Sequence, residues 1–305
     1  MKISIVVLTY NHEKYLTECI ESILNQEIHD EYEILIGNDK SPDNTEKILE
    51  KYEKNEKIKI YNRTENIGAT KNLLDLLEKS QGEYIALLEG DDYWVDNKKL
   101  LKQIDILDKN KEYVLCLTQS LTVDENSKII GEKQIDISKI DSIKKLFFYR
   151  GGIPTGTVIF RNIFKNTVGK EVKKLLVSSN IIGDLSLFSY LINYGNFYNL
   201  KEKTGAYRYI TNSGTSYSAM NSYKQGLELE KVVKEILNYD KTDNEFLKLY
   251  LNRIQYKLLK NNWKYLKILS LWEKIDVFKY IMLLPYYNLK YSNIKKEVKK
   301  NAENK

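Results

Sequence analysis

The sequence predicts an α/β protein with a mainly parallel β-sheet flanked by helices and a helical C-terminal extension. Two observations predict this class. Short apolar runs alternate with segments of helical periodicity through the first hundred residues, which is the pattern of successive βαβ units. After about residue 222 the pattern becomes almost entirely helical. The chain has 305 residues, of which 42% are hydrophobic, so it can bury a large core.

The strands of the first half are predicted from continuous β-branched and aliphatic runs, as expected for strands covered on both faces. The helices between them are predicted from apolar residues at i, i+3 and i+4 spacing. Such βαβ connections are right-handed and place helices on both faces of the sheet. In chain order, strands are expected at residues 3–8, 33–37, 58–61 and 84–88, and helices at about residues 15–24, 43–52 and 73–77.

The second half mixes strands and helices before it becomes helical. We expect a domain boundary in the polar stretch at residues 213–222, which gives a catalytic domain at 1–218 and a helical, basic region at 219–305. The strands expected here are 114–120, 157–161 and 206–210, and the helices are 97–109, 140–149 and 184–194.

Cysteine content and apolar runs exclude several classes of protein. Cys19 and Cys116 are far apart, which excludes a disulfide-stapled scaffold and predicts reduced core thiols in a cytoplasmic protein. No run reaches the roughly 18 apolar residues of a transmembrane helix, and the first apolar run is too short for a signal peptide.

Polar clusters follow the four strands of the first half at the point where each strand ends. In an open parallel sheet, ligands bind outside the carboxyl ends of the strands. The sequence therefore predicts a ligand site at this edge of the sheet. The clusters are Thr9-Tyr10-Asn11, Asn38-Asp39, residues 62–66 and residues 89–92.

The pair Asp91-Asp92 stands close to Glu89 at the end of a buried strand. Carboxylates this close repel one another unless a positive group lies among them. A Mn²⁺ or Mg²⁺ ion that carries a diphosphate would relieve the repulsion. An exposed acidic turn before the next helix is the alternative, and the pair alone does not separate the two.

Asp184 precedes a predicted helix, so it is either a helix N-cap or a general base. Tyr93 and Trp94 follow the acidic pair and either contact a ligand or form wall and core. Other chemistries lack their residues, because the sequence has no P-loop, no strand-anchored G-x-G-x-x-G, no G-x-S-x-G and only two histidines. Catalysis would therefore depend on carboxylates and a metal.

Five segments, in order and with matching gaps, resemble family 2 glycosyltransferases of the GT-A fold, a Rossmann-like sheet flanked by helices. The resemblance covers about residues 1–215. The segments are ISIVVLTYNHEKYLTECIESILNQ (3–26), IGNDKSPDNT (36–45), RTENIGATKN (63–72), GEYIALLEGDDYW (82–94) and IGDLSLFSYLINYG (182–195).

The resemblance implies a metal-dependent, inverting transfer of a sugar from a UDP-sugar to a hydroxyl group of an acceptor. It implies that Tyr10 stacks near the uracil, that Asp39 accepts a hydrogen bond from it, and that Asp92 of the DxD-like motif holds the metal. Asp91 then lies beside the donor sugar or ribose, and Asp184 is the catalytic base. The donor-binding set so implied is Thr9, Tyr10, Asn11, Asp39, Asn66, Lys71, Asp91, Asp92, Trp94 and Arg208.

The sequence departs from the family pattern at four positions. Asn38 replaces the first acid of an Asp-Asp pair, and Glu89 replaces the first Asp of the metal motif. Lys71 stands where Arg is common, so the charge remains but the bidentate fork is lost. Ile210 stands where a His often follows Tyr-Arg, which weakens any role of that loop in holding the metal.

The partners implied are a UDP-sugar and a glycan, lipid-linked or protein-linked acceptor, in bacterial surface polysaccharide or glycan assembly. The net charge is +6, and residues 277–291 are aromatic and are followed by lysines. This composition fits either packed helices with a solvated end or weak peripheral contact with the inner face of the cell membrane. We expect no nucleic-acid partner. Two other functions stay open: a sugar nucleotidyltransferase and an inactive nucleotide-sugar-binding module.

Overall fold

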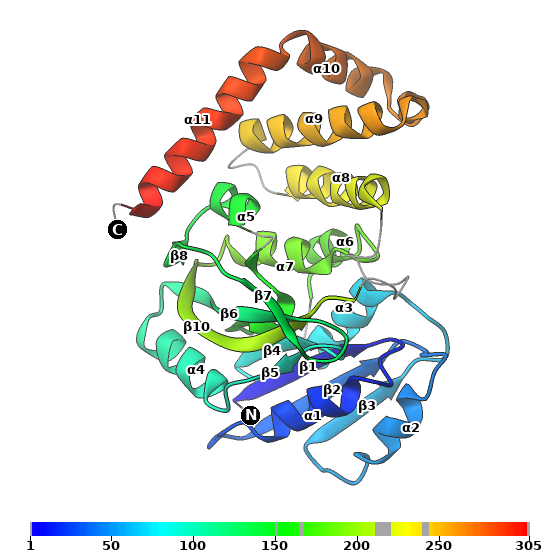
Figure 1. Ribbon diagram of the computed structural model, residues 1–305, viewed down its shortest axis with the longest axis vertical. Coiled ribbons are helices and arrows are strands. Elements are labelled where there is room, and N and C mark those ends of the chain that lie inside the picture. The colour runs from blue at the N-terminus through cyan, green and yellow to red at the C-terminus, as the bar shows by residue number, and fades with distance from the viewer. Residues whose placement is uncertain (1, 150–151, 165–167, 211–220, 240–243, 304–305) are drawn as a thin grey trace.

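The computed structural model describes residues 2–149, 152–164, 168–210, 221–239 and 244–303. A twisted central sheet forms one end of the molecule, and the C-terminal helices stack away from it toward the other end (Figure 1). The predicted α/β class with a helical extension is confirmed.

The first half forms the predicted parallel sheet. Strands β1 (Ile3–Thr9) and β4 (Tyr84–Glu89) pair in parallel at its centre, with β2 (Tyr32–Asn38) and β3 (Ile58–Asn62) added on the other side of β1. The sheet order is β3-β2-β1-β4-β9-β6-β10-β5. The connecting helices are α1 (Leu16–Leu24), α2 (Thr45–Glu50) and α3 (Ala69–Lys79).

The side chains of β1 alternate between two cores, one on each face of the sheet. Ile5 and Val7 face a core shared with α1, α2 and α4 (Lys99–Lys109), while Val6 faces a core shared with α3. Helix α6 (Lys170–Leu176) and helix α7 (Gly183–Leu191) lie on the Val6 side. The fold is therefore a three-layer sandwich with both sheet faces covered.

The second half of the sheet contains antiparallel pairs that the sequence pattern did not predict. Strand β9 (Ile159–Arg161) runs antiparallel to both β4 and β6 (Tyr113–Val123). Strand β10 covers Asn196–Arg208, so it begins ten residues before the predicted 206–210 strand. The short strands are β5 (Tyr93–Trp94), β7 (Ile129–Lys133) and β8 (Lys139–Ile140).

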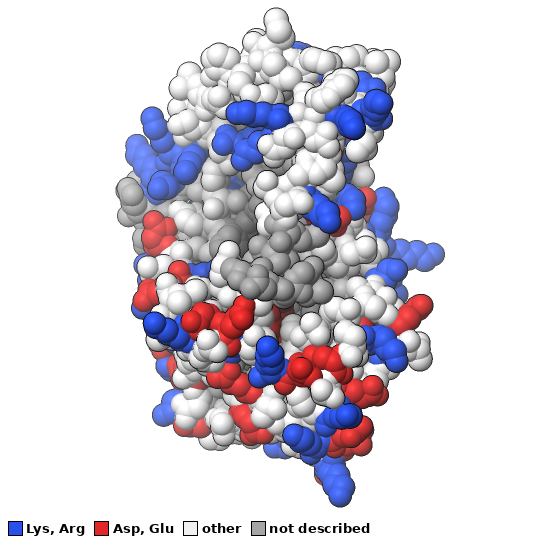
Figure 2. All heavy atoms as spheres, turned by 45° about the vertical axis from the view of Figure 1, so that its right-hand side comes forward, with Lys and Arg blue, Asp and Glu red and all other residues white. Residues whose placement is uncertain are grey.

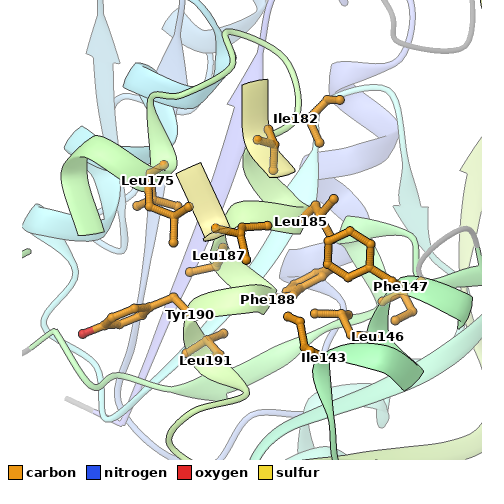
Figure 3. Packing of buried hydrophobic residues seen from close by; sticks show 14 of the residues in the cluster. Ile143, Leu146, Phe147, Leu175, Ile182, Leu185, Leu187, Phe188, Tyr190 and Leu191 are labelled. Atoms are coloured by element: carbon orange, nitrogen blue, oxygen red, sulfur yellow. The ribbon is translucent and has the colours of Figure 1, made fainter. Parts of the chain in front are cut away.

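Helix α7 is buried around almost its whole circumference. Leu185, Leu187 and Phe188 pack in one cluster with Phe147 of α5 (Ile143–Tyr149) and Leu175 of α6 (Figure 3). A helix that is apolar on all sides is buried and is stabilised by packing against its neighbours. The start of α7 is thereby fixed against the sheet.

The helical extension continues the core of the first part. Helix α8 (Ser222–Tyr239) packs on α6 and α7, and Val232, Val233 and Ile236 join the same apolar cluster. Helix α9 (Asn244–Asn261), the 3₁₀ helix η4 (Trp263–Lys267), α10 (Leu271–Met282) and α11 (Leu284–Glu303) follow. The predicted boundary at residue 218 lies outside the described residues and stays a prediction.

Gly82, in the turn before β4, packs closely against the backbone of β1. A Cβ added at Gly82 would lie 2.4 Å from the Ser4 backbone nitrogen, and backbone atoms of paired strands have little room to shift. We expect Gly82→Ala to lower the free energy of unfolding by roughly 1–3 kcal/mol in guanidinium titrations. The matched control is Gly131→Ala, whose Cβ meets only Thr122 at 3.9 Å. Equal stability of the two variants would contradict this packing.

Candidate active site

The predicted ligand edge is present in the structure. Thr9 lies beside Asn38 in the β1–β2 register, and Leu8 lies beside Glu89 in the β1–β4 register. Asn38 in turn donates a hydrogen bond to Asn62 (2.9 Å) at the end of β3. The strand ends that carry the predicted polar clusters are thus neighbours at one edge of the sheet, as predicted.

Asp39 ties the loop after β3 to this edge. Its two carboxylate oxygens accept hydrogen bonds from the backbone N–H groups of Ile67 (2.7 Å) and Gly68 (2.9 Å). The side-chain amide of Asn66 donates to the Asp39 carbonyl oxygen (3.1 Å). Asp39 is only 3% exposed, and in this conformation its carboxylate binds the loop after β3.

The acids at the end of β4 form a crowded group. Burial and the neighbouring charges of Asp91 and Asp184 raise the pKa of Glu89 to about 8, although Thr155 donates a hydrogen bond to its carboxylate. Burial, Asp91 and Glu89 also raise the pKa of Asp92 well above its usual range. The sequence argument that these carboxylates repel one another therefore holds in the folded chain.

The carboxylates of Asp91 and Asp92 differ in their hydrogen-bond partners. One oxygen of Asp92 accepts a hydrogen bond from the Arg208 backbone N–H (2.8 Å). The Oδ1 atom of Asp91 is buried and has no hydrogen-bond partner among the described residues, while its Oδ2 lies 3.8 Å from His12 Nε2. Buried carboxylate oxygens without partners are costly, so this atom marks a place for a cationic ligand.

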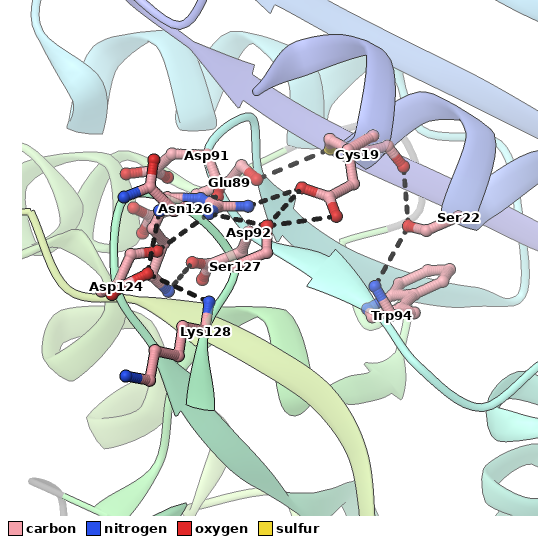
Figure 4. A network of polar contacts seen from close by, with 12 residues as sticks. Cys19, Ser22, Glu89, Asp91, Asp92, Trp94, Asp124, Asn126, Ser127 and Lys128 are labelled. Carbon is pink, nitrogen blue, oxygen red and sulfur yellow. Dashed lines mark hydrogen bonds and ion pairs between the residues drawn. The ribbon is translucent and has the colours of Figure 1, made fainter. Parts of the chain in front are cut away.

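The Arg208 guanidinium holds this acidic turn from behind. Its Nε donates to the Asp91 carbonyl oxygen (2.8 Å), Nη1 donates to the Asp124 carbonyl (3.0 Å) and to Ser127 Oγ (3.1 Å), and Nη2 pairs with Glu18 (2.6 Å). Figure 4 shows Asp124 and Ser127 of the β6–β7 hairpin close to Asp91 and Asp92. One side chain thus joins β4, α1 and the hairpin.

This arrangement changes the role expected for Arg208. Its side chain is 1% exposed, and its donors are directed at protein oxygens. In this conformation the guanidinium is enclosed by its hydrogen bonds and by the rings of Tyr15 and Tyr93. The direct contact with the donor that the resemblance implies stays a prediction, while the observed contacts position the acidic turn.

Trp94 also lies away from the ligand edge. Its indole N–H donates to the Gly156 carbonyl oxygen (2.8 Å), and the buried Lys99 ammonium stands 4.6 Å from its ring centroid. The ring is part of the core under α4. Of the two alternatives predicted for this aromatic pair, Trp94 takes the core position, and its ring has no open face for a sugar.

The remaining predicted residues surround the edge. Thr9 is buried, Tyr10 is half-buried, and Asn11 has a left-handed φ of 61° and donates its N–H to Ser41 (3.0 Å). Asp184 opens α7, and its Oδ1 accepts the Leu185 N–H (2.8 Å). The Asp184 charge contributes to the raised pKa of Glu89, so Asp184 lies within electrostatic reach of the acidic group.

Lys71 is exposed on the first turn of α3 and forms no hydrogen bond or ion pair with these acids among the described residues. No three His, Cys, Asp or Glu side chains in the described part of the chain stand in a geometry that could hold a metal ion. The donor set nevertheless fits a hard divalent cation, since Mn²⁺ and Mg²⁺ bind one or two carboxylates together with ligand phosphates. The unpartnered Asp91 Oδ1 fits such a ligand.

A family model described as Glycosyl transferase family 2 matches residues 4–168, more than half of the chain. The chain belongs to glycosyl transferase family 2.

Relatives of this family include an uncharacterised glycosyltransferase of Methanocaldococcus jannaschii, which is 34% identical over 148 residues, covering 48% of this chain and 51% of the relative. The Staphylococcus aureus poly(ribitol-phosphate) β-N-acetylglucosaminyltransferase TarS is 36% identical over 104 residues, covering 33% of this chain and 18% of TarS. The chain spans about half the length of the first curated relatives it matches.

Solved structures of glycosyltransferases share the fold. TarS 1–349 in complex with UDP-GlcNAc has a TM-score of 0.63 at 20% identity, over 92% of this chain and 79% of that one. The mannosyltransferase PcManGT of Pyrobaculum calidifontis, with GDP-Man and Mn²⁺, has a TM-score of 0.56 at 12% identity, over 97% and 84%. The GT-A fold predicted from the sequence motifs is therefore confirmed.

Three groups of this family 2 site were missed by the sequence analysis. Glu18 and the 124–127 turn bind the Arg208 guanidinium, and Thr155 donates a hydrogen bond to Glu89, each from a distant part of the chain. Glu18 lies 190 positions from its partner Arg208, and no spacing or composition signal links residues that far apart. They meet because β10 pairs with β5, and β5 packs on α1.

The first site prediction concerns Arg208. A lysine ammonium cannot replace the planar guanidinium that binds the Asp91 and Asp124 carbonyl oxygens and Glu18 at once. Arg208→Lys should therefore lower the free energy of unfolding by roughly 2–4 kcal/mol in guanidinium titrations. Arg253→Lys is the matched control, because that guanidinium stands over the Tyr291 ring and forms no hydrogen bond or ion pair within the described residues. If both variants unfold at the same denaturant concentration, Arg208 does not join the elements as described.

The second site prediction concerns pH. Glu89 has a pKa of about 8 in the folded chain and near 4.5 when unfolded, so the folded state binds more protons between these values. Stability of the metal-free protein should therefore fall as pH rises through this window. Glu89→Gln removes one titrating group, and its melting temperature should fall less between pH 6 and pH 8.

The matched control for the pH experiment is Glu33→Gln. The carboxylate of Glu33 is buried, but hydrogen bonds from Lys59, Gln81 and Ser4 lower its pKa. It stays charged throughout this range, so Glu33→Gln should keep the wild-type slope between pH 6 and pH 8 at lower overall stability. A Glu89→Gln slope as steep as that of the wild type would refute the raised pKa.

Proposed function

We propose that this chain is a metal-dependent, inverting glycosyltransferase that moves a sugar from a UDP-sugar to a hydroxyl group of a glycan, lipid-linked or protein-linked acceptor. One observation carries the proposal: the acids Glu89, Asp91, Asp92 and Asp184 converge at the carboxyl edge of the sheet in a family 2 chain. Family membership alone does not specify the donor, because related folds bind UDP-GlcNAc and GDP-Man.

Asp91 and Asp92 are the residues proposed to hold Mn²⁺ or Mg²⁺. Asp91 offers its unpartnered Oδ1, and Asp92 offers the oxygen that the Arg208 N–H leaves open. A bound divalent ion supplies charge neutralisation for a leaving diphosphate. The chain's own contribution is to hold both residues in position through the Arg208 contacts.

The nucleoside diphosphate is proposed to bind over the ends of β1 and β2. Tyr10 and Asn11 border this region, and Asn66 and Lys71 stand on the loop and helix beyond it. Reading of the base by Asp39 requires its carboxylate to accept a further hydrogen bond beside those from Ile67 and Gly68. A carboxylate has acceptor capacity for this.

Asp184 is the proposed general base. It lies at the start of a helix that is fixed by packing on every side, so its carboxylate is held relative to the acids of β4. Removal of the acceptor hydroxyl proton on the face opposite the leaving group gives a single in-line step and inversion at the anomeric carbon. Its N-terminal helix position also stabilises the charged form.

Two features argue against the alternatives. A nucleotidyltransferase needs a glycine-rich, lysine-bearing loop after β1, and here Thr9-Tyr10-Asn11-His12 follows instead. An inactive module would not need four converging carboxylates, whose mutual repulsion costs stability. The setting in bacterial surface polysaccharide or glycan assembly is supported by the relative named as a poly(ribitol-phosphate) transferase.

The decisive experiment measures release of nucleoside diphosphate from a panel of UDP-sugars and GDP-mannose, with Mn²⁺ or with EDTA. We expect release from one UDP-sugar only when Mn²⁺ is present. Asp184→Asn should slow release by about a hundredfold or more, the usual contribution of a general base, while the melting-temperature shift caused by UDP and Mn²⁺ stays intact.

Each arm of this experiment can fail separately. If GDP-mannose alone is turned over, the UDP-sugar assignment is wrong. If no nucleotide sugar shifts the melting temperature or is cleaved, the chain is not a glycosyltransferase acting on these donors. Full activity of Asp184→Asn would remove Asp184 as the base without affecting the donor assignment.

A further inference from the structure

Helix α10 carries two apolar stripes, and only one of them packs against other parts of the described chain. Val277 and Tyr280 are buried against α9. On the opposite side, four apolar residues at i, i+4, i+7 and i+11 spacing form one continuous face. We call this face the outer stripe: Leu271, Ile275, Phe278 and Met282, which are 46–81% exposed.

The outer stripe cannot turn inward without breaking a polar network. Glu273 at the start of α10 pairs with Lys234 of α8 and forms a capping box with Ser270. Lys234 also pairs with Glu230 (2.8 Å), which accepts a hydrogen bond from Gln255 of α9 (3.0 Å). These contacts fix the rotation of α10 and leave the stripe pointing to solvent.

Further exposed apolar side chains lie close to the outer stripe in the sequence. Trp263 of η4, Ile268 and Trp272 lie before it or beside it in the chain, and Tyr286 and Leu289 of α11 follow it. Two of the three tryptophans of the chain are therefore in this exposed region. Indole rings favour the boundary between water and an apolar phase.

The surroundings of the outer stripe are basic. Residues 263–290 contain five lysines against Glu273 and Asp276, and Glu273 is already paired. Residues 219–305 carry 18 Lys and Arg against 10 Asp and Glu, a net charge of +8, which leaves −2 for residues 1–218. The end of the molecule that holds α10 is at the top in Figure 1, and Figure 2 shows it white and blue.

We propose that the outer stripe of α10, with Trp263 and Trp272, lies in the headgroup region of an anionic lipid bilayer. The apolar face would enter the boundary of the acyl chains while the lysines meet lipid phosphates. A second copy of the chain fits less well, because face-to-face contact would bring two basic surfaces together. The stripe runs along the whole of α10, so the helix would lie in the membrane plane. None of the described helices is long and apolar enough to cross a bilayer.

The test is flotation of the full chain with phosphatidylcholine vesicles, with and without phosphatidylglycerol. We expect binding only to the anionic vesicles. The stripe variant changes Leu271, Ile275, Phe278 and Met282 to Gln, which keeps helix propensity, and should lower vesicle affinity at least about tenfold. Lys264→Gln, Lys267→Gln, Lys274→Gln and Lys279→Gln together should do the same and make the remaining binding insensitive to salt.

The matched control is Ile129→Gln with Ile130→Gln, which removes exposed apolar side chains from β7 instead. It should bind vesicles like the wild type, and circular dichroism should show native helix content for all variants. Unchanged binding of the stripe variant, or equal binding to neutral vesicles, would overturn the proposal. So would a dimer in light scattering that the stripe variant disperses while no vesicle binding occurs. None of these outcomes depends on the UDP-sugar assignment.

Discussion

The candidate site depends on one constraint, the gathering of three carboxylates within four residues at the end of a buried strand. Glu89, Asp91 and Asp92 would push this turn apart if nothing opposed them. Arg208 opposes them through its backbone N–H on Asp92 and its guanidinium on the Asp91 carbonyl. The guanidinium does not pair directly with these carboxylates, so their mutual repulsion remains. A bound cation would relieve it.

The contacts of Arg208 depend on the joining of the two halves of the sheet. Strand β10 delivers Arg208 to the ligand edge because it runs parallel to β6, which in turn is linked through β9 to β4. The 124–127 turn and Glu18 of α1 then enclose the guanidinium. The donor edge formed by the first hundred residues is therefore completed by strands from the second half.

The helical extension plays a corresponding part on the other side of the sheet. Its helix α8 closes the apolar cluster around α7, and α7 carries Asp184 at its start. Packing of the extension thus contributes to the position of the proposed base. At its far end, the Lys234–Glu273 contact sets the rotation of α10 and leaves an apolar face without a partner in the described chain.

The sequence by itself determined the parallel half of the fold, the ligand edge and the identity of its acids. Strands β1 to β4 are continuous apolar runs with polar residues at their ends, and both signals are local. The antiparallel strand β9, the early start of β10 and the burial of Trp94 could not be predicted, since each depends on pairing or packing between distant segments.

Only the tertiary structure decided what each polar side chain does. The sequence motif placed Arg208 among the donor-binding residues, but the fold encloses it between β4, α1 and the 124–127 turn and makes it a support for the acids. The Asp39 carboxylate likewise accepts hydrogen bonds from the backbone of a loop 28 residues further along the chain. Residue type and spacing fix which chemistry is available, whereas burial and long-range hydrogen bonds decide which atoms remain open to a ligand.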